Sequence, residues 1–160
     1  MREQIEKEVP EFEERTLGIK RVAKTTKGGK QMRLLVCSAV GDSISRVGIG
    51  VGKSAEIANS SKKAQEQAKK NMVEVKHHKN TIPHIVMGKC GGARILIRPA
   101  SPGTGIIACD TVRNILELCG IKDALTKSFG SSSADNLAKA TMSALSKLRT
   151  REEVFKLRGI

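Results

Sequence analysis

Hydrophobic and polar positions alternate along three stretches in the first half of the chain, which predicts β-strands over residues 15–24, 31–40 and 45–52. The motif TTKGGK separates the first two strands, and its Gly28-Gly29 pair suits a tight hairpin because glycine adopts positive φ at little cost. The middle strand is apolar on both faces, so we expect it to be central in the sheet.

The third stretch, RVGIGVGKS from Arg46 to Ser54, superficially resembles a nucleotide-binding loop. A P-loop requires glycine, four residues and then Gly-Lys-Ser/Thr, and the position of that first glycine is occupied by Val47. The alternation of Val47, Ile49 and Val51 favours a strand instead. Glycine at the intervening positions indicates that another backbone approaches this strand closely.

A helix is expected over residues 55–72, with Ser54 as its N-terminal cap. Small and apolar residues recur there at helical spacing, at Ile57, Ser61, Ala64, Ala68 and Met72. Lysines occupy other positions, at Lys62, Lys63, Lys69 and Lys70. Such a charge run is either a solvated helix face or a phosphate contact, and the small number of acidic neighbours favours the contact.

The second half of the chain predicts a different order of elements. Two strands, 81–89 and 93–99, surround a Gly91-Gly92 turn, and helices are expected over 111–119 and 134–148 with a short strand between them. The helical patterns predict buried faces formed by Val112, Ile115, Leu116, Cys119, Leu137, Thr141, Ala144, Leu145 and Leu148. Thr150 and Glu153 have the spacing of a capping box for a last short helix.

These elements predict an α+β fold with two domains. The N-terminal domain, residues 15–75, has the strand–strand–strand–helix order of a double-stranded-RNA-binding fold, with a three-stranded antiparallel sheet and a helix. The C-terminal domain, residues 81–160, is expected to be an α/β domain of β-β-α-β-α order. An acidic leader, residues 1–14, precedes them, and the polar stretch within 73–80 is expected to connect them.

Charge adds the first functional information. The formal net charge is +13, and it is distributed as −4 over residues 1–14, +11 over 15–80 and +6 over 81–160. A polyanionic partner is therefore expected for the first domain. Nucleic acid is favoured over an anionic membrane because no amphipathic helix with bulky apolar anchors accompanies the lysines, and no apolar run is long enough to span a bilayer.

Only three aromatic residues are present, Phe12, Phe129 and Phe155. Proteins that read single-stranded nucleic acid commonly stack its bases on aromatic side chains. We therefore expect this chain to contact phosphates and the shape of a duplex, with base reading a minor part.

The sequence contains no spacing of cysteine and histidine residues that is typical of a catalytic or metal-binding site. The four cysteines form no Cys-x-x-Cys motif, and without an export signal they are best read as reduced, partly buried thiols. The spacing of His77, His78, His84 and Cys90 fits no standard zinc site. We expect no metal, no cofactor and no catalytic residue.

Six motifs, taken in order, carry a family resemblance: FEER with KGGK, VGD with RVGIGVGK, AKKN, TIPH, RPASPGTGIIA and LTKSFGS. Together they resemble the bacterial-type fifth protein of the small ribosomal subunit, the S-five family, over about nine-tenths of the chain. The resemblance implies a structural protein without enzymatic activity that binds small-subunit, 16S-type ribosomal RNA. It further implies roles in subunit assembly, in lining the messenger RNA entry path and in decoding accuracy.

The same resemblance implies neighbours and a location. The neighbours are the small-subunit proteins S-four and S-eight, and the KGG hairpin would lie near the spectinomycin region. The location would be a cytoplasmic ribosome or the ribosome of an organelle that encodes its own ribosomal proteins. A free double-stranded-RNA-binding regulator and a nucleotide-binding enzyme are the other function classes that the sequence leaves for comparison.

Two sets of site residues follow from the motifs and the resemblance. The residues expected to bind ribosomal RNA are Arg21, Lys24, Lys27, Gly28, Gly29, Lys30, Arg46, Lys53, Lys62, Lys63, Lys69 and Lys70. Those expected at a protein interface are Gly103, Thr104, Gly105 and Arg113.

The chain departs from the family pattern at three places. Ser43-Ile44-Ser45 replaces a turn that commonly holds Asn-Gly, Cys109-Asp110 replaces two glycines, and Gln31-Met32-Arg33 replaces aromatic residues after the hairpin. The first departure implies a changed turn, and the second allows Asp110 to cap the following helix.

Overall fold

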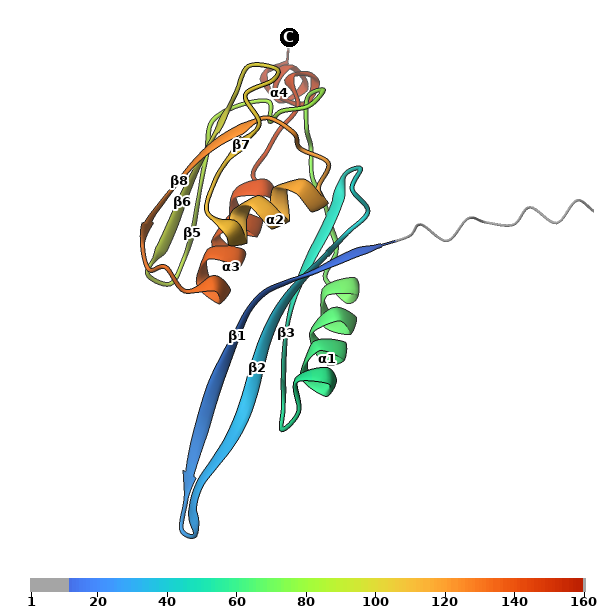
Figure 1. Ribbon diagram of the computed structural model, residues 1–160. Coiled ribbons are helices and arrows are strands. Elements are labelled where there is room, and N and C mark those ends of the chain that lie inside the picture. The colour runs from blue at the N-terminus through green and yellow to red at the C-terminus, as the bar shows by residue number, and fades with distance from the viewer. Residues whose placement is uncertain (1–11, 160) are drawn as a thin grey trace, which may run out of the picture.

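The computed structural model describes residues 12–159, which form two four-stranded sheets and four helices (Figure 1). The first half contains β1 (Glu13–Thr26), β2 (Gly29–Gly41), β3 (Arg46–Ser54), α1 (Ile57–Lys70) and β4 (Val73–Glu74). The second half contains β5 (Val86–Cys90), β6 (Ala93–Pro99), β7 (Ile106–Ile107), α2 (Asp110–Leu118), β8 (Ala124–Gly130), α3 (Ala134–Leu145) and α4 (Arg151–Arg158). The expected α+β class is confirmed.

The first sheet is antiparallel with the strand order β1-β2-β3-β4. Its second strand is central, as its apolar pattern predicted, and Val36, Cys37, Ala39 and Val40 are all at most 1% exposed. Both faces are buried because α1 packs against one face while α2 and α3 lie on the other (Figure 1). The sheet is therefore the middle layer of this part of the molecule.

The glycines of β3 face the backbone of α1. A Cβ atom added to Gly48, Gly50 or Gly52 would lie 2.1, 2.0 and 2.0 Å from the carbonyl oxygens of Ala68, Ala64 and Ser60, respectively. The predicted close approach of a backbone is thus confirmed, and the backbone belongs to this chain. A helix in that position leaves no space for a nucleotide phosphate over these glycines.

Gly50→Ala should lower stability substantially because the new methyl group meets helix backbone, which cannot rotate away. We expect a loss of about 2–3 kcal/mol, since overpacking of a core costs about 1–3 kcal/mol or more. For a chain of this size the melting temperature should fall by roughly 5–10 °C. Gly28→Ala is the control, because apart from its chain neighbours no atom of the described part of the chain lies within 4 Å of an added Cβ there. Equal melting temperatures for the two variants would contradict the close packing.

The second sheet has the strand order β5-β6-β8-β7, with β7 parallel to β8 and the other pairs antiparallel. Helices α2 and α3 cover one face of it, and the predicted buried stripes of both helices are confirmed. Gly88 of β5 lies against α3, where an added Cβ would be 2.0 Å from the carbonyl oxygen of Ala140.

Several boundaries and caps differ from the sequence-based expectations. Glu56 rather than Ser54 precedes α1, and it makes no side-chain capping bond. The buried positions of α1 are Ser60, Ala64 and Ala68, whereas Ile57 is 51% exposed. Asp110 is the first residue of α2 rather than its cap. The capping box of Thr150 and Glu153 is confirmed.

The two halves share one connected apolar core. Cys37 and Ala39 of β2 belong to the same buried cluster as Leu116 and Leu118 of α2. On the surface above it, Arg15 of β1 donates hydrogen bonds to Glu13 and to Glu117 of α2. The connecting stretch expected within residues 73–80 also contributes to this core, because Val75 is only 2% exposed.

The structure also differs from the sequence-based expectation at both ends of the first domain. Of the acidic leader expected over 1–14, residues 1–11 lie outside the described part of the chain, but Glu13 and Glu14 belong to β1. Val73 and Glu74, expected in the connecting stretch, form β4 and pair with Val47 and Arg46 of β3.

Candidate RNA interface

The two longest strands continue beyond the sheet as a two-stranded ribbon. Pairing of β2 with β3 stops at Leu34, whereas β1 and β2 remain paired from Val22 opposite Arg33 to Thr26 opposite Gly29. Figure 1 shows the ribbon projecting past the end of α1. Residues 23–33 are all exposed, so the ribbon has no apolar core of its own. A hairpin of this kind is marginally stable in water, which favours a partner that binds it.

The ribbon is strongly basic on both faces. Residues 20–33 contain six Lys and Arg residues and no Asp or Glu. The register places Arg21 and Lys30 on one face and Lys24 and Arg33 on the other, because residues directly opposite each other in an antiparallel pair share a face. Cations on both faces suit a ribbon that lies between two segments of a polyanion.

The tip of the ribbon is formed by the KGGK motif. The Thr26 side chain donates a hydrogen bond of 2.9 Å to the carbonyl oxygen of Gly29, and Gly29 has φ +134°. Lys27 and Lys30 are exposed on either side of the two glycines. The glycines therefore serve the turn, while the lysine side chains are available to a ligand.

Two shallow hollows lie at the base of the ribbon. One, of about 290 Å³, brings Lys53 of β3 beside Lys24 and Arg33. The other, of about 280 Å³, is lined by Arg21 together with Met32, Leu34 and Ala55. Sequence reasoning missed Arg33, which it treated only as a substituted aromatic position. Its place opposite Val22 in a long hairpin was the signal that would have included it.

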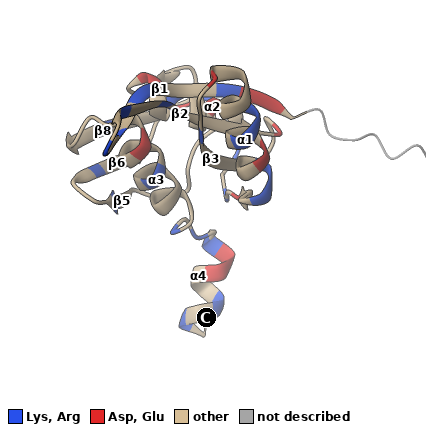
Figure 2. Cartoon of the chain, turned by 90° about the horizontal axis from the view of Figure 1, so that it is seen from below, with Lys and Arg blue, Asp and Glu red and all other residues tan. Residues whose placement is uncertain are grey.

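The lysines of α1 extend the basic surface. Lys62, Lys63, Lys69 and Lys70 are exposed on the side of α1 that faces away from the sheet, since Ser60, Ala64 and Ala68 face inward. Figure 2 shows Lys and Arg on both α1 and the neighbouring strands. Lys69 is partly neutralised by an ion pair of 2.8 Å with Glu14.

Arg46 is not brought to this surface. It begins β3 at the end remote from Lys53, and seven residues of extended strand span about 23 Å. It follows the turn that replaces the family's Asn-Gly. There the Asp42 carboxylate accepts hydrogen bonds from the backbone N–H groups of Ile44, Ser45 and Arg46, and Ser43 adopts φ +55°. Burial acts to raise the pKa of Asp42, but these N–H groups hold it below its ordinary value.

The second predicted set of residues lies at the other end of the molecule. Gly103 and Gly105 have φ +87° and +74°, and apart from their chain neighbours no atom of residues 12–159 lies within 4 Å of a Cβ added to either. Thr104 is held by hydrogen bonds from its N–H and hydroxyl group to the carbonyl oxygen of Ser101. The glycines thus serve the loop conformation, and the space around them is open.

Arg113 of α2 is joined to this loop. Its guanidinium donates a hydrogen bond of 3.4 Å to the carbonyl oxygen of Ile106, the residue after Gly105. It also lines a hollow of about 540 Å³ together with Ser43, Glu117 and Lys122. The structure therefore brings Gly103, Thr104, Gly105 and Arg113 together. Figure 1 shows β7, which follows this loop, well apart from the tip of the β1–β2 ribbon.

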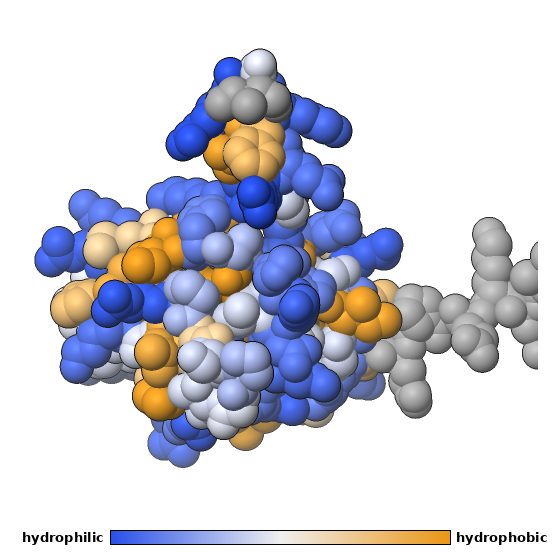
Figure 3. Space-filling view, turned by 90° about the horizontal axis from the view of Figure 1, so that it is seen from above, coloured by the Kyte–Doolittle hydropathy of each residue, from blue (hydrophilic) through white to orange (hydrophobic). Residues whose placement is uncertain are grey.

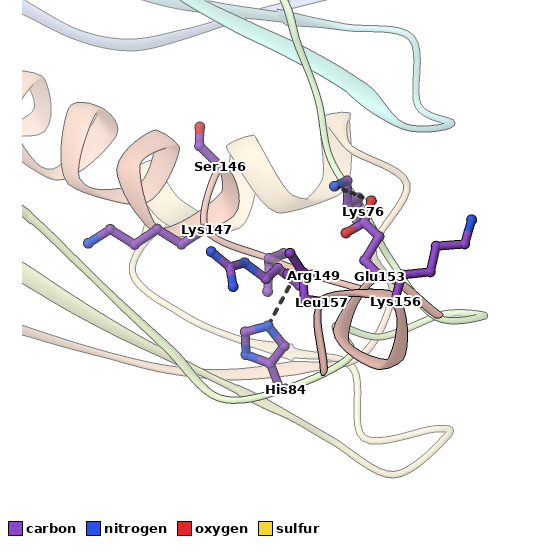
Figure 4. Close-up of a pocket in the computed structure, with 9 residues that line it drawn as sticks. Lys76, His84, Ser146, Lys147, Arg149, Glu153, Lys156 and Leu157 are labelled. Atoms are coloured by element: carbon purple, nitrogen blue, oxygen red, sulfur yellow. Dashed lines mark hydrogen bonds and ion pairs between the residues drawn. The ribbon is translucent and has the colours of Figure 1, made fainter. Parts of the chain in front are cut away.

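A wide, open hollow of about 800 Å³ lies between α4 and the end of α3 (Figure 4). Lys76 pairs with Glu153 across it at 2.5 Å, and the N–H of Arg149 donates to Nε2 of His84 at 3.1 Å. Its lining contains one carboxylate and no nucleophile–base pair, so its residues do not form a catalytic arrangement.

The described residues form no metal-binding cluster and no disulfide. Between residues 12 and 159, no three His, Cys, Asp or Glu side chains gather closely enough to hold a metal ion. All four cysteines are free thiols, and burial raises the pKa of Cys37 to about 11 and that of Cys119 still further. Within the same range, no helix is long and apolar enough to cross a membrane.

Comparison with protein families gives two matches. The family described as "Ribosomal protein S5, N-terminal domain" matches residues 12–76, and "Ribosomal protein S5, C-terminal domain" matches residues 88–158. The first includes the ribbon and α1, and the second includes the loop around Thr104.

Individual relatives agree with these matches. The chain is 46% identical over 161 aligned positions to "Small ribosomal subunit protein uS5" of Pseudothermotoga lettingae, covering 100% of this chain and 90% of that protein. It is 47% identical over 150 positions to the proteins of the same name from Thermotoga petrophila and Thermotoga maritima, covering 94% of this chain and 84% of each relative.

Proposed function

The chain belongs to the ribosomal protein S5 family, a family of structural rather than enzymatic proteins, and we propose that it is a constituent of the small ribosomal subunit that binds its ribosomal RNA. The basic β1–β2 ribbon is the observation that carries the RNA-binding part of this proposal. Its exposed cations on both faces and its lack of a core favour a polyanionic partner.

The ribosomal RNA contacts would involve the exposed cations of the ribbon, Lys53 and α1. The ribbon would contribute to subunit assembly and extend toward the messenger RNA entry region. Arg46, at the opposite end of β3, would contact RNA separately or belong to the junction between the halves. Gly28 and Gly29 would shape the tip rather than bind phosphate through their own atoms.

The loop around Thr104, with Arg113, would form an interface with a neighbouring small-subunit protein. The family resemblance assigns this region to the S-four neighbour, and the S-eight neighbour would contact another part of the second half. Open space around Gly103 and Gly105 and an exposed Arg113 support an interface here. Through this interface the protein would influence decoding accuracy, on a bacterial ribosome or on that of an organelle.

A free double-stranded-RNA-binding regulator is the alternative. It shares the N-terminal fold, and it would bind generic duplex without belonging to a ribosome. The location of the native chain distinguishes the two functions, since only the ribosomal function requires the chain to sediment with small subunits.

Gly103→Arg should raise misreading in assembled ribosomes because it adds bulk and charge to the proposed interface. It also places a side chain at φ +87°, a conformation that costs a non-glycine residue about 1–2 kcal/mol. Gly103→Ala is the matched control, since it has the same backbone strain without the bulk or charge. The measurement is a stop-codon readthrough reporter in cells whose small subunits contain the variant, beside a melting curve of the free protein.

Raised readthrough for Gly103→Arg alone is the expected result. Equal readthrough for Gly103→Arg, Gly103→Ala and the unaltered protein, with full incorporation into subunits, would reject the interface. A large fall in melting temperature for both variants would instead assign the loop a structural role.

A further inference from the structure

The second sheet has one face that no element of the described chain covers. Most side chains of β5, β6, β7 and β8 on that face are exposed and Leu96 is half-buried, whereas the alternating positions of β5 and β6 that face α3 are buried. Figure 1 shows α2 and α3 on the opposite side of the sheet. The large apolar side chains there are Ile85 (just before β5), Met87, Leu96, Ile107, Leu125 and Phe129, and the charged ones are Lys89, Arg94, Arg98 and Lys127. We call this surface the open sheet face. In the view from above in Figure 3, apolar residues (orange) lie beside hydrophilic ones (blue) on the left side of the molecule.

The strand register places these side chains in rows. Phe129 of β8 lies opposite Arg94 of β6, and Arg94 lies opposite Lys89 of β5. The next row contains Lys127, Leu96 and Met87 in the same strand order. Cations and apolar groups therefore alternate along β6 and β8, and the two kinds of side chain are mixed over the sheet instead of forming separate patches.

The charge of the open sheet face is entirely positive. None of its four cations takes part in an ion pair between described residues. Lys89 and Arg94 are directly opposite each other, and like charges in that position destabilise a sheet. An anion bound over this row would remove the repulsion, so the charges favour an anionic partner.

The apolar side chains indicate which class of anion fits the open sheet face. Phe129 is 42% exposed, and Leu96 and Met87 lie in the adjoining row. Unpaired bases stack on aromatic rings and on guanidinium planes, whereas the bases of a duplex are already stacked inside the helix. A four-stranded sheet with an exposed aromatic ring and surrounding cations thus has the chemistry to bind single-stranded RNA.

A protein partner fits this surface less well. Protein–protein interfaces are enriched in arginine and aromatic residues but depleted of lysine. Here Lys127 lies on β8, one of the two inner strands of the sheet, opposite Leu96, and Lys89 lies on the neighbouring part of β5. The arrangement favours a partner whose negative charges are distributed among its apolar groups, as phosphates are among the bases of RNA.

We propose that the open sheet face binds an unpaired segment of RNA, with a base stacked on Phe129 and Arg94 and phosphates near Lys89, Arg98 and Lys127. This inference rests on the proposed function, because the RNA would be part of the small subunit. The protein would then contact RNA in two ways: duplex through the ribbon and α1, and unpaired strand through the second sheet.

The test compares binding of the full-length protein to a single-stranded RNA 12-mer of mixed sequence and to a 12-base-pair RNA duplex. Phe129→Ala with Arg94→Gln should lower the affinity for the single strand by about tenfold or more and leave the duplex affinity unchanged. Phe155→Ala with Arg151→Gln is the matched control, because Arg151 lies 5.0 Å from the Phe155 ring on α4, outside the open sheet face. This control should alter neither affinity.

Phe129→Tyr provides a second variant, since it retains the aromatic ring and should retain single-strand binding. Unchanged single-strand affinity in the Phe129→Ala, Arg94→Gln variant, with a normal melting curve, would overturn the inference and leave the face to a protein partner. Loss of single-strand affinity in Phe129→Tyr as well, or equal losses for single strand and duplex, would also overturn it. Duplex binding and sedimentation with small subunits test the proposed function separately, so either proposal can fail alone.

Discussion

Raising the salt concentration from about 50 to about 200 mM should lower the affinity of the full chain for duplex RNA by about a thousandfold. The reason is the release of counterions: each phosphate neutralised by Lys or Arg contributes about 0.7–0.9 to the slope of log affinity against log salt concentration. The ribbon with Lys53 and the α1 lysines presents enough exposed cations for about six such contacts, which corresponds to a slope near −5.

The full chain is the correct reagent for this measurement. An isolated segment 15–75 would expose the face of β2 and β3 that α2 and α3 cover, where Cys37, Ala39 and Val47 are buried. Fluorescence anisotropy with a labelled duplex across a salt series gives the slope directly. A slope near zero would contradict a phosphate-based interface.

Replacing Lys27 and Lys30 together with Gln should lower the affinity for duplex RNA about 10–100-fold at low salt. Hydrogen bonds to charged groups contribute about 1.5–3 kcal/mol each, and part of that is retained by solvent and neighbouring cations. The salt slope should become shallower by nearly two. Folding should be unaffected, because both side chains are exposed and the two glycines of the turn remain.

Lys122→Gln with Lys139→Gln is the charge-matched control, since both lysines are exposed in the second half of the chain, away from the ribbon. In cells, the ribbon variant should assemble poorly into small subunits or change the response to spectinomycin. Full assembly, unchanged drug response and unchanged RNA affinity would contradict this prediction and show that the KGGK tip serves only as a turn.

Local patterns predicted those features that depend on neighbours in the sequence. The alternation in 31–40 identified a strand buried on both faces, and Thr150 with Glu153 identified a capping box. The glycines of β3 predicted that another backbone packs closely against the strand. A Cβ atom on Gly50 or Gly52 would lie only 2.0 Å from a carbonyl oxygen of α1, so only glycine fits at these positions. Each of these signals is a steric or hydrogen-bonding requirement of the residue itself.

Features that depend on distant contacts were not predictable in this way. The stripe on α1 was assigned to Ile57 and Ser61, but Ser60 is buried because the glycines of β3 admit only small side chains there. The joining of Val73 and Glu74 to β3 depends on where the chain goes after α1. Likewise, the ribbon is basic in the sequence, but its projection follows from where β3 ends its pairing with β2.

The candidate sites divide along the same line. The sequence identified most of the basic residues of the ribbon and α1, and the structure adds Arg33 and separates Arg46 from them. The open sheet face escaped notice because its residues come from β5, β6, β7 and β8, and only the register makes them neighbours.

The most direct measurement of the central claim is sucrose-gradient fractionation of native cell extract after a high-salt wash. A protein held only by surface charge dissociates from RNA as salt rises, whereas a constituent enclosed by the assembled particle remains bound. The proposed function predicts that the chain sediments with small ribosomal subunits, in proportion to their RNA, before and after the wash. Recovery of the chain mainly in the soluble fractions at the top of the gradient would contradict it.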